Sequence, residues 1–425
     1  MKKLFLSIVA VCGLAAMTGC DVHIFKSSGG WSDADLKAAT NVVQTAGIPD
    51  GLKRLEVDNR FGTVHITGTE NGRTSWTWKL AARARSDAVA QQIASGASCK
   101  AELEGDHLSL VVSLPESKEP HSIQSDLEIS VPKAAAVQTR NRFGTTDIAD
   151  LAGDVEATNQ NGRLGIRNIG GTVRARTSFA TLSVSNTGPA TLKNQNGALR
   201  AAGIRGSLDA ATSFDSLVAR DIGGAATLHN QNGRIEASGI RGSLEARTSF
   251  DSLIARDIGG AVHLRDQNGA VKIVRVGGDA DIATSFDSLG VEGIQGDAIL
   301  INQNGTVRAS GVAGSVKAST SFAAMEVTGA GSNFVCHNQN GAIRLRATSA
   351  TLTSIEAKTS FDTLEIHLPA SLKPAIQART TFGEVESDFP VLMKPPGEEP
   401  FAGVAPGTAR ITLLNQNGKI GVVRD

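Results

Sequence analysis

Residues 228–269 read LHNQNGRIEASGIRGSLEARTSFDSLIARDIGGAVHLRDQNG, and this stretch decides the fold class. The motif NQNG begins at Asn230, and a second motif, TSF, begins at Thr248. A variant of the first motif, DQNG, begins at Asp266, after an equal interval. A fixed period of about 18 residues is typical of proteins built from stacked repeats, each of which packs only on its neighbours.

The two motifs alternate along most of the 425 residues. Copies of the first begin at Asn159, Asn194, Asn230, Asp266, Asn302, Asn338 and Asn415, and copies of the second begin at Thr177, Thr212, Thr248, Thr284, Thr320 and Thr359. The related motifs NRFG, at Asn59 and Asn141, and TTF, at Thr380, extend the series. One repeat unit therefore spans the interval between neighbouring motifs and occurs in two alternating forms.

Polar and apolar residues alternate within each repeat. Leu244, Ala246 and Thr248 occupy every second position before Phe250, and Leu253 and Ala255 do so after it. This period of two predicts strands with one buried face. The position three residues after the third residue of each motif is aliphatic in successive repeats, as at Leu253 and Val271, which predicts that the strands stack coil on coil. The predicted fold class is all-β: a single-chain β-solenoid, or β-helix, with coils of about 18 residues and a small α+β cap insertion near the N-terminus.

The third residue of each motif, which we call the marker, is Phe in one form of the repeat and Asn in the other. The markers of the central array are Phe143, Asn161, Phe179, Asn196, Phe214, Asn232, Phe250, Asn268, Phe286, Asn304, Phe322 and Asn340. The residue four positions earlier is often Ala in Phe repeats and Leu in Asn repeats, as at Ala246 and Leu264. We therefore predict that the markers form Asn/Phe core ladders in which large and small side chains compensate.

The N-terminus has the pattern of an export signal. Lys2 and Lys3 precede a short apolar run, and small residues lead to Cys20. This arrangement predicts a signal peptide over 1–19 and resembles the bacterial lipobox, in which the cysteine becomes lipidated. After processing, Cys99 and Cys336 would remain, and two cysteines so far apart do not form a disulfide framework.

The remaining chain divides by pattern. We predict a lipid-anchored tether over 20–50, a first coil with the cap insertion over 51–136, solenoid repeats over 137–382, and a proline-rich loop with a terminal coil over 383–425. Within the cap, residues 86–98 have the pattern of an amphipathic helix. Trp76 and Trp78 alternate as on a strand, and 108–114 and 127–131 also have the pattern of strands.

Composition excludes some functions and leaves others open. Lys and Arg number 42, as do Asp and Glu, and this balance argues against a nucleic-acid partner. His229, His263 and His337 lack metal-ligand spacing, so we expect neither a metal nor a cofactor. Outward positions hold mixed charges, which predict a solvated face, with Ile299, Ile301 and Val335 as a small apolar exception.

A catalytic interpretation rests on Asp215, Asp251 and Asp287, which recur once every two repeats. Two strand spacings would separate them by ~9.6 Å, at the outer edge of the range for the carboxylates of inverting glycosidases. They occupy the bend position that Gly fills in the other repeats, so turn chemistry explains them equally. We assign no catalytic residue and expect no enzyme activity.

The segment LEVDNRFGTVHITG (55–68), the lipobox and the regular β repeats together resemble the bacterial putative-adhesin family of β-strand-repeat domains, whose function is unknown. The resemblance covers about 51–425 and implies an envelope-exposed solenoid without established catalytic residues. We therefore expect a non-enzymatic lipoprotein, at the periplasmic face or the outer surface, which binds envelope polysaccharide or a surface protein. The alternatives are a polysaccharide-active β-helix enzyme and an envelope-stress sensor or scaffold for a membrane protein.

Overall fold

The computed structural model describes residues 18–26, 38–48, 50–116, 119, 121–392, 401 and 404–425, without the side chains of 18–26 and 38. Residues 1–17 of the predicted signal peptide lie outside this range, as does the Cys20 side chain. The chain divides into two compact units, Met1–Thr212 (unit 1) and Ser213–Asp425 (unit 2), which are described separately. In the described parts of the chain, no helix is long and apolar enough to cross a lipid bilayer.

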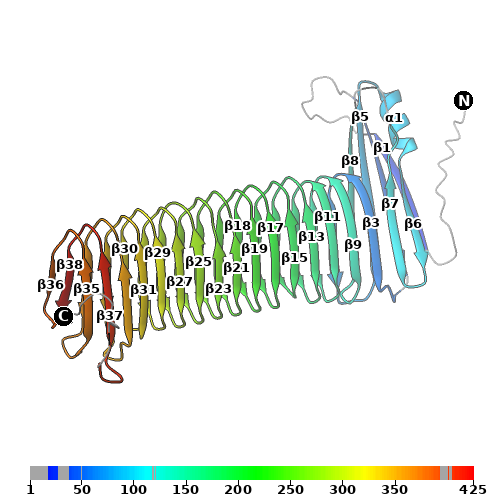
Figure 1. The fold of residues 1–425 in the computed structure, drawn as a ribbon. Helices are drawn as coiled ribbons and strands as arrows, with labels where there is room; N and C mark the ends of the chain where they lie inside the picture. The colour runs from blue at the N-terminus through cyan, green and yellow to red at the C-terminus, as the bar shows by residue number, and fades with distance from the viewer. Residues whose placement is uncertain are drawn as a thin grey trace, which may run out of the picture. The chain divides into compact units, whose positions relative to one another are not determined.

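Within each unit, every coil contributes one strand to each of two sheets, called A and B (Figure 1). Neighbouring strands of the solenoid pair in parallel, with equivalent residues of successive repeats side by side, as Ile235 pairs with Leu253 and Leu253 with Val271. Inward aliphatic side chains from the two sheets fill the core, and these three are at most 1% exposed. The predicted β-solenoid is confirmed, and so is the predicted coil length, because paired residues are one repeat apart in the sequence.

In unit 1, the strands of each sheet have the following spatial order. Sheet A runs β1 (Thr18–Lys26), β2 (Ala38–Ile48), β5 (Thr74–Ala84), β8 (His121–Pro132), β4 (Val64–Thr69), β10 (Thr146–Leu151), β12 (Leu164–Ile169), β14 (Leu182–Thr187), β16 (Leu199–Ile204). Sheet B runs β6 (Ser98–Glu104), β7 (His107–Ser113), β3 (Arg54–Phe61), β9 (Ala136–Phe143), β11 (Val155–Asn161), β13 (Val173–Thr177), β15 (Ala190–Asn194), β17 (Leu208–Thr212).

Unit 2, described by itself, has the same two-sheet pattern. Sheet A runs β18 (Leu217–Ile222), β20 (Ile235–Ile240), β22 (Leu253–Ile258), β24 (Val271–Val276), β26 (Leu289–Ile294), β28 (Val307–Val312), β30 (Met325–Gly329), β32 (Ile343–Ala347), β34 (Leu364–Leu368), β38 (Ile420–Arg424), β36 (Val385–Ser387). Sheet B runs β19 (Ala226–Asn230), β21 (Leu244–Arg247), β23 (Val262–Arg265), β25 (Ala280–Thr284), β27 (Ala298–Asn302), β29 (Val316–Thr320), β31 (Asn333–Asn338), β33 (Ser354–Lys358), β37 (Arg410–Asn415), β35 (Ala375–Thr380).

One coil in each unit lies out of chain order. In unit 1, β7 and β8 come from the cap insertion, yet they stack in parallel on β3 and β4. In unit 2, the last strands of the chain, β37 and β38, insert between β33 and β35 and between β34 and β36. Spatial order therefore departs from sequence order in both units.

The cap contains the predicted helix and strands. β5 pairs antiparallel with β8 and buries Trp76 and Trp78, which are 1% and 2% exposed. The helix α1 (Asp87–Gly96) starts after Ser86, whose side chain accepts a bond from the Val89 amide, and it packs on β2 and β5. The stretch predicted as a tether, 20–50, differs from that expectation: it contains β1 and β2, which pair with each other and extend sheet A from β5.

At the bend opposite the markers, one residue in each of several coils adopts the left-handed backbone conformation. Gly239, Asp257 and Arg275 occupy equivalent positions in successive coils, with φ of 65°, 56° and 59°. The next residue turns inward, so Ile240 and Ile258 are buried. The conformation is strained for arginine, and Arg275 donates two hydrogen bonds of 2.5 and 2.9 Å to the Asp257 carboxylate, which hold the Asp257 pKa below its usual value.

Candidate binding surface at the marker bend

The markers do not form a core ladder, so that prediction was wrong. The Phe markers of unit 1, Phe143 and Phe179, are 42% and 56% exposed. Those of unit 2 are 51–78% exposed: Phe214, Phe250, Phe286, Phe322, Phe361 and Phe382. The Asn markers Asn161, Asn196, Asn232, Asn268, Asn304 and Asn340 are half-buried. The chain leaves extended conformation at the bend (β21 ends at Arg247 and β25 at Thr284), so the period of two no longer decides which way the next side chains point.

The residue two positions before each marker faces inward instead. Asn230 donates to the Asp215 and Arg234 carbonyls and accepts from the Gly233 amide. On the next coil, Thr248 donates to the Gly233 carbonyl at 3.0 Å. The buried ladder is therefore mainly one of Asn and Thr, and each Asn or Thr rung hydrogen-bonds the bend of the coil before it.

Asp266 occupies a rung of this ladder where other coils have Asn. It is 5% exposed, and neither carboxylate oxygen has a hydrogen-bond partner of normal geometry. Burial raises the Asp266 pKa to about 6, an effect that the amides of Gln267, Asn268 and Gly269 partly oppose. The rung is therefore a titrating site inside an otherwise neutral ladder.

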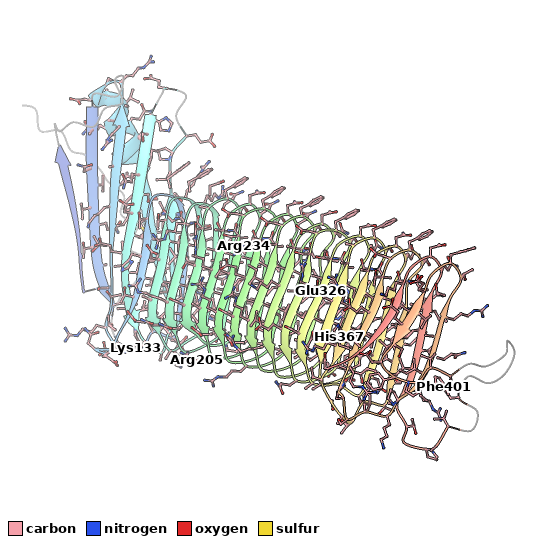
Figure 2. All side chains as sticks on the ribbon, turned by 90° about the vertical axis from the view of Figure 1, so that its left-hand side faces the viewer. Lys133, Arg205, Arg234, Glu326, His367 and Phe401 are labelled. Atoms are coloured by element: carbon pink, nitrogen blue, oxygen red, sulfur yellow. The ribbon has the colours of Figure 1, made fainter. Side chains whose placement is uncertain are left out.

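Because neighbouring strands pair in parallel with equivalent residues side by side, the exposed Phe markers of unit 2 form a row along one edge of its coils. Figure 2 shows aromatic side chains that project from an edge of the coils. Phe250 follows β21 and Phe286 follows β25, with β23 and its marker Asn268 between them. Two strand spacings, ~9.6 Å, therefore separate successive rings. We call Phe214, Phe250, Phe286, Phe322, Phe361 and Phe382 the phenylalanine row.

The side chains of the Asn markers between the rings are hydrogen-bonded to the backbone of the preceding coil. Each Nδ2 donates to the carbonyl of the serine that precedes a phenylalanine of the row, as Asn268 does to Ser249 at 2.9 Å and Asn304 to Ser285 at 3.2 Å. Asn417 does the same to Ser360. The amides therefore bond to the backbone, and gaps remain between the rings of the row.

The out-of-order coil preserves this spacing at the C-terminal end. In the sequence, Phe361 and Phe382 are successive markers, and Asn417 comes last. In space, β37 lies between β33 and β35, which places Asn417 between the two phenylalanines. The alternation of Phe and Asn is thus a property of the folded edge as well as of the sequence.

Two neighbouring coils of unit 1 show the opposite arrangement. β3 pairs directly with β9, and their markers Phe61 and Phe143 lie opposite each other. Their rings stack with centroids 5.1 Å apart and an interplanar angle of 13°. Rings on adjacent coils therefore contact each other, whereas rings on alternate coils stand apart.

The aspartates considered as catalytic residues follow Phe markers at the bend. Asp215, Asp251 and Asp287 are exposed, and each accepts a 2.6 Å hydrogen bond from the amide of the next residue. Asp287 also has a φ of 60°, which Asp tolerates better than most residues. These contacts favour the turn interpretation. Asp362, after Phe361, makes the same contact, so four carboxylates flank the row.

Each of the three histidines singled out in the sequence forms at most one ion pair within the described residues. His263 lies 3.2 Å from Asp281 and His337 3.3 Å from Glu356, while His229 is exposed. Among the described residues, no group of three or more His, Cys, Asp or Glu could hold a metal. Cys99 is buried, and burial raises the pKa of the Cys336 thiol to about 12, which makes that thiol unreactive.

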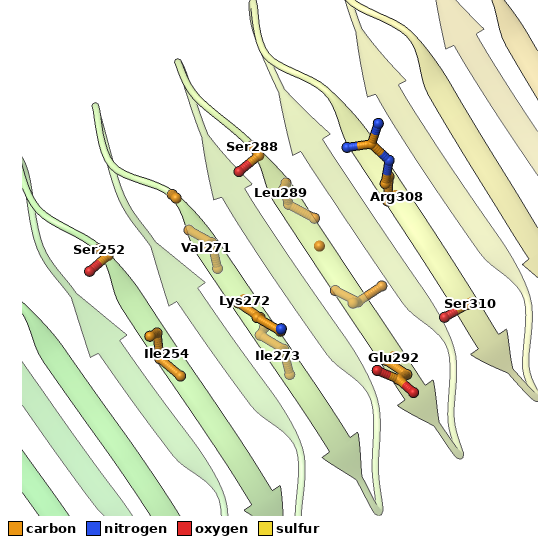
Figure 3. A pocket seen from close by; sticks show the side chains of 13 residues that line it. Ser252, Ile254, Val271, Lys272, Ile273, Ser288, Leu289, Glu292, Arg308 and Ser310 are labelled. Carbon is orange, nitrogen blue, oxygen red and sulfur yellow. The ribbon is translucent and has the colours of Figure 1, made fainter.

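Other outward positions of unit 2 hold exposed ion pairs, such as Arg308 with Glu326 at 3.2 Å. A shallow depression of about 480 Å³ lies on sheet A where Gly290 interrupts a column of longer side chains, between Lys272 and Arg308 (Figure 3). On sheet B, Ile299 and Ile301 are each 41% exposed, as predicted. The phenylalanine row is the larger apolar feature.

No protein-family model matches the chain, and no curated protein matches it. Among solved structures, a putative cell adhesion protein from Clostridium sporogenes is similar at 8% identity, covering 96% of this chain and 100% of its own, with a TM-score of 0.16. A putative adhesin from Bacteroides fragilis is similar at 11% identity, covering 90% of this chain and 97% of its own, with a TM-score of 0.21. TM-scores this low establish neither a shared fold nor a shared function.

Proposed function

We propose that this chain is a non-enzymatic lipoprotein of the bacterial cell envelope, anchored through Cys20, which acts as an adhesin by binding a partner through the phenylalanine row. The observation that carries the proposal is the exposure of six phenylalanines at regular spacing along one edge of unit 2. Large apolar side chains gathered on a surface mark interaction sites, whereas scattered single ones do not.

The repeated geometry suits adhesion. Each ring offers a weak contact, and several identical contacts along one edge act together when the partner is also extended or repetitive. The carboxylates of Asp215, Asp251, Asp287 and Asp362 flank the row, and their charge disfavours anionic partners such as nucleic acids or acidic lipid surfaces. Neutral envelope polysaccharide and surface proteins remain as partner classes.

The experiment uses the mature chain with Cys20→Ser, which removes the lipid but retains β2 and all of β1 from residue 20 onward. The protein is incubated with insoluble envelope and extracellular polysaccharides and with whole bacterial cells, and sedimented protein and released sugar are both measured. We expect saturable sedimentation without sugar release, and loss of sedimentation in Phe250→Ser/Phe286→Ser. The matched control is Ile299→Ser/Ile301→Ser, which removes exposed apolar side chains outside the row and should sediment normally.

Three other outcomes would redirect the assignment. Sugar release that disappears in Asp251→Asn/Asp287→Asn would make the bend aspartates catalytic and the chain a polysaccharide-active enzyme. Binding that survives the phenylalanine substitutions would move the site elsewhere. If neither polysaccharide nor cells bind, a sensor or scaffold that contacts a membrane protein becomes the better assignment.

A further inference from the structure

Successive rings of the phenylalanine row are two strand spacings apart, which leaves room for one further ring between each pair. We propose that two copies of this chain associate through unit 2, each inserting its phenylalanines into the gaps of the other. The inference rests on the proposed adhesive role of the row and names its partner as a second copy, so that adhesion would be homotypic.

The first argument is the stacking distance. A ring placed midway between Phe250 and Phe286 would lie ~4.8 Å from each, because the two are separated by two strand spacings. The chain already contains this contact: Phe61 and Phe143, on adjacent coils, stack at 5.1 Å. An inserted row would extend the same arrangement along the whole edge.

The second argument is the period. A partner must offer planar groups every two strand spacings to occupy successive gaps together, and a second copy has that period by construction. The Asn268 and Asn304 side-chain amides at the base of the gaps already bond to the backbone of the preceding coil, so an inserted ring would not deprive them of a partner. The coil that contains Asn417 maintains the gap between Phe361 and Phe382 although it is out of chain order.

The third argument is area. The six rings are 51–78% exposed, and a phenylalanine buries ~150–250 Å², so the row offers roughly 700 Å² per copy. Stable dimers bury about 800 Å² per partner, and the side chains around the rings supply the remainder. A two-fold axis across the row makes the copies antiparallel and closes the contact as a dimer.

The flanking carboxylates predict how the affinity of this dimer depends on salt concentration. In the antiparallel arrangement, the column Asp215, Asp251, Asp287 and Asp362 of one copy faces the same column of the other. Salt screens this repulsion while leaving the ring contacts intact, so the dimer should strengthen as ionic strength rises. A contact dominated by opposite charges would weaken instead.

Sedimentation equilibrium of the mature chain carrying Cys20→Ser, over a range of concentrations and salt, tests the proposal. We expect a monomer–dimer equilibrium strengthened by salt. Phe250→Ser/Phe286→Ser/Phe322→Ser should raise the dimer dissociation constant at least ~100-fold, because truncating a single central interface aromatic commonly costs about 30-fold. Ile299→Ser/Ile301→Ser should leave the dissociation constant unchanged.

The decisive variant adds rings. In Asn268→Phe/Asn304→Phe, the chain fills two gaps with its own phenylalanines, so the dimer should weaken although the edge becomes more apolar. If the dimer strengthens, the contact is unspecific and the proposal fails. Circular dichroism and thermal unfolding establish that each variant is folded before association is measured.

The same variants separate this inference from the adhesive role. A chain that stays monomeric at all concentrations, yet sediments with polysaccharide or cells in a phenylalanine-dependent manner, overturns the homotypic contact and leaves the proposed function standing. A chain whose phenylalanine substitutions alter neither association nor sedimentation overturns both.

Discussion

Phenylalanine has different surroundings in two regions of the marker bend. On adjacent coils of unit 1, Phe61 and Phe143 stack on each other, and Asn59 and Asn141 lie buried beneath them. In unit 2, an Asn coil separates each phenylalanine from the next, and Thr alternates beneath with Asn or, in one coil, with Asp266. Within the described part of unit 2, these rings form no aromatic pair. Spacing alone thus decides whether a ring at this bend stabilises the fold or remains available to a partner.

The comparison also distinguishes the buried residues that stabilise the marker bend from the exposed residues at its surface. The buried Asn and Thr rungs satisfy backbone groups that would otherwise lack partners, so their contribution is to stability. The rings of the phenylalanine row are largely exposed to solvent and should contribute little to the stability of unit 2. Substitutions at the two kinds of position should therefore differ most in stability, and the following predictions run from the largest effect to the smallest.

The largest loss is expected at a buried rung. Asn302 donates to the Asp287 and Thr306 carbonyls and accepts from the Gly305 amide, at 2.8, 3.2 and 3.0 Å. Asn302→Ala leaves these groups unsatisfied and should lower the free energy of unfolding by about 3 kcal/mol, measured by urea denaturation. The control is Asn304→Ala, two residues later, which removes one hydrogen bond from a half-buried marker and should cost under ~1 kcal/mol. Equal losses would contradict the assignment of inner and outer positions.

The next effect is expected at Asp266 and depends on pH. Its folded pKa of about 6 lies above its ordinary value of 3.8. Stability should therefore be highest when the carboxyl is protonated in both states, should fall as pH rises from about 4 through about 6, and should then level off. Asp266→Asn restores the amide found in other rungs. It should stabilise the protein on the order of 3 kcal/mol at pH 8 and much less at pH 4.

Thermal unfolding of Asp266→Asn and the parent chain across this pH range measures the difference. Asp266→Ala serves as the control, since it removes the charge without restoring the hydrogen bonds. It should remove the Asp266 contribution to the pH dependence but give less stabilisation than Asn. A difference between the parent and Asp266→Asn that does not vary with pH would show that Asp266 does not titrate in this range.

The smallest effects compare the two kinds of ring directly. Phe61→Ser removes a stacked partner and should cost ~1 kcal/mol, because aromatic pairs contribute about that much beyond area burial. Phe250→Ser removes a ring that is 63% exposed, and its unfolding free energy should change by less than ~0.5 kcal/mol. If Phe250→Ser proves as costly as Phe61→Ser, the row supports the fold and its assignment as a binding surface fails.

Much of the architecture could be predicted from residues that are near one another in the chain. The regular spacing of the motifs, the alternation around Phe250 and the aliphatic position after each motif predicted the β-solenoid, and the structure confirms it. The helix and strands of the cap were predicted by the same kind of pattern, and they include the strand that buries Trp76 and Trp78. Such patterns are informative because extended strands impose a fixed alternation on their side chains.

The candidate site was only half predicted. The motifs were recognised and Thr248 was placed on the buried face of its strand, but the phenylalanines were placed inside as well, and the ladder of hydrogen-bonded Asn and Thr was not predicted. One signal could have indicated the outcome: Asp follows Phe at Asp215, Asp251, Asp287 and Asp362, which is typical of an exposed turn. The strand β2 was missed because its partner, β5, lies far along the chain.

The sequence by itself determined the repeat length, the strand faces and the alternation of Phe and Asn, because each depends on local periodicity. Only the tertiary structure decided that the markers point outward, since the alternation of side chains ends where the chain bends. It also decided the order of the end coils: β37 lies between β33 and β35, although it is the later strand in the chain. Parallel pairing joins residues distant in sequence, and strands of near-identical pattern leave their spatial order to be settled by the packing of the whole coil stack.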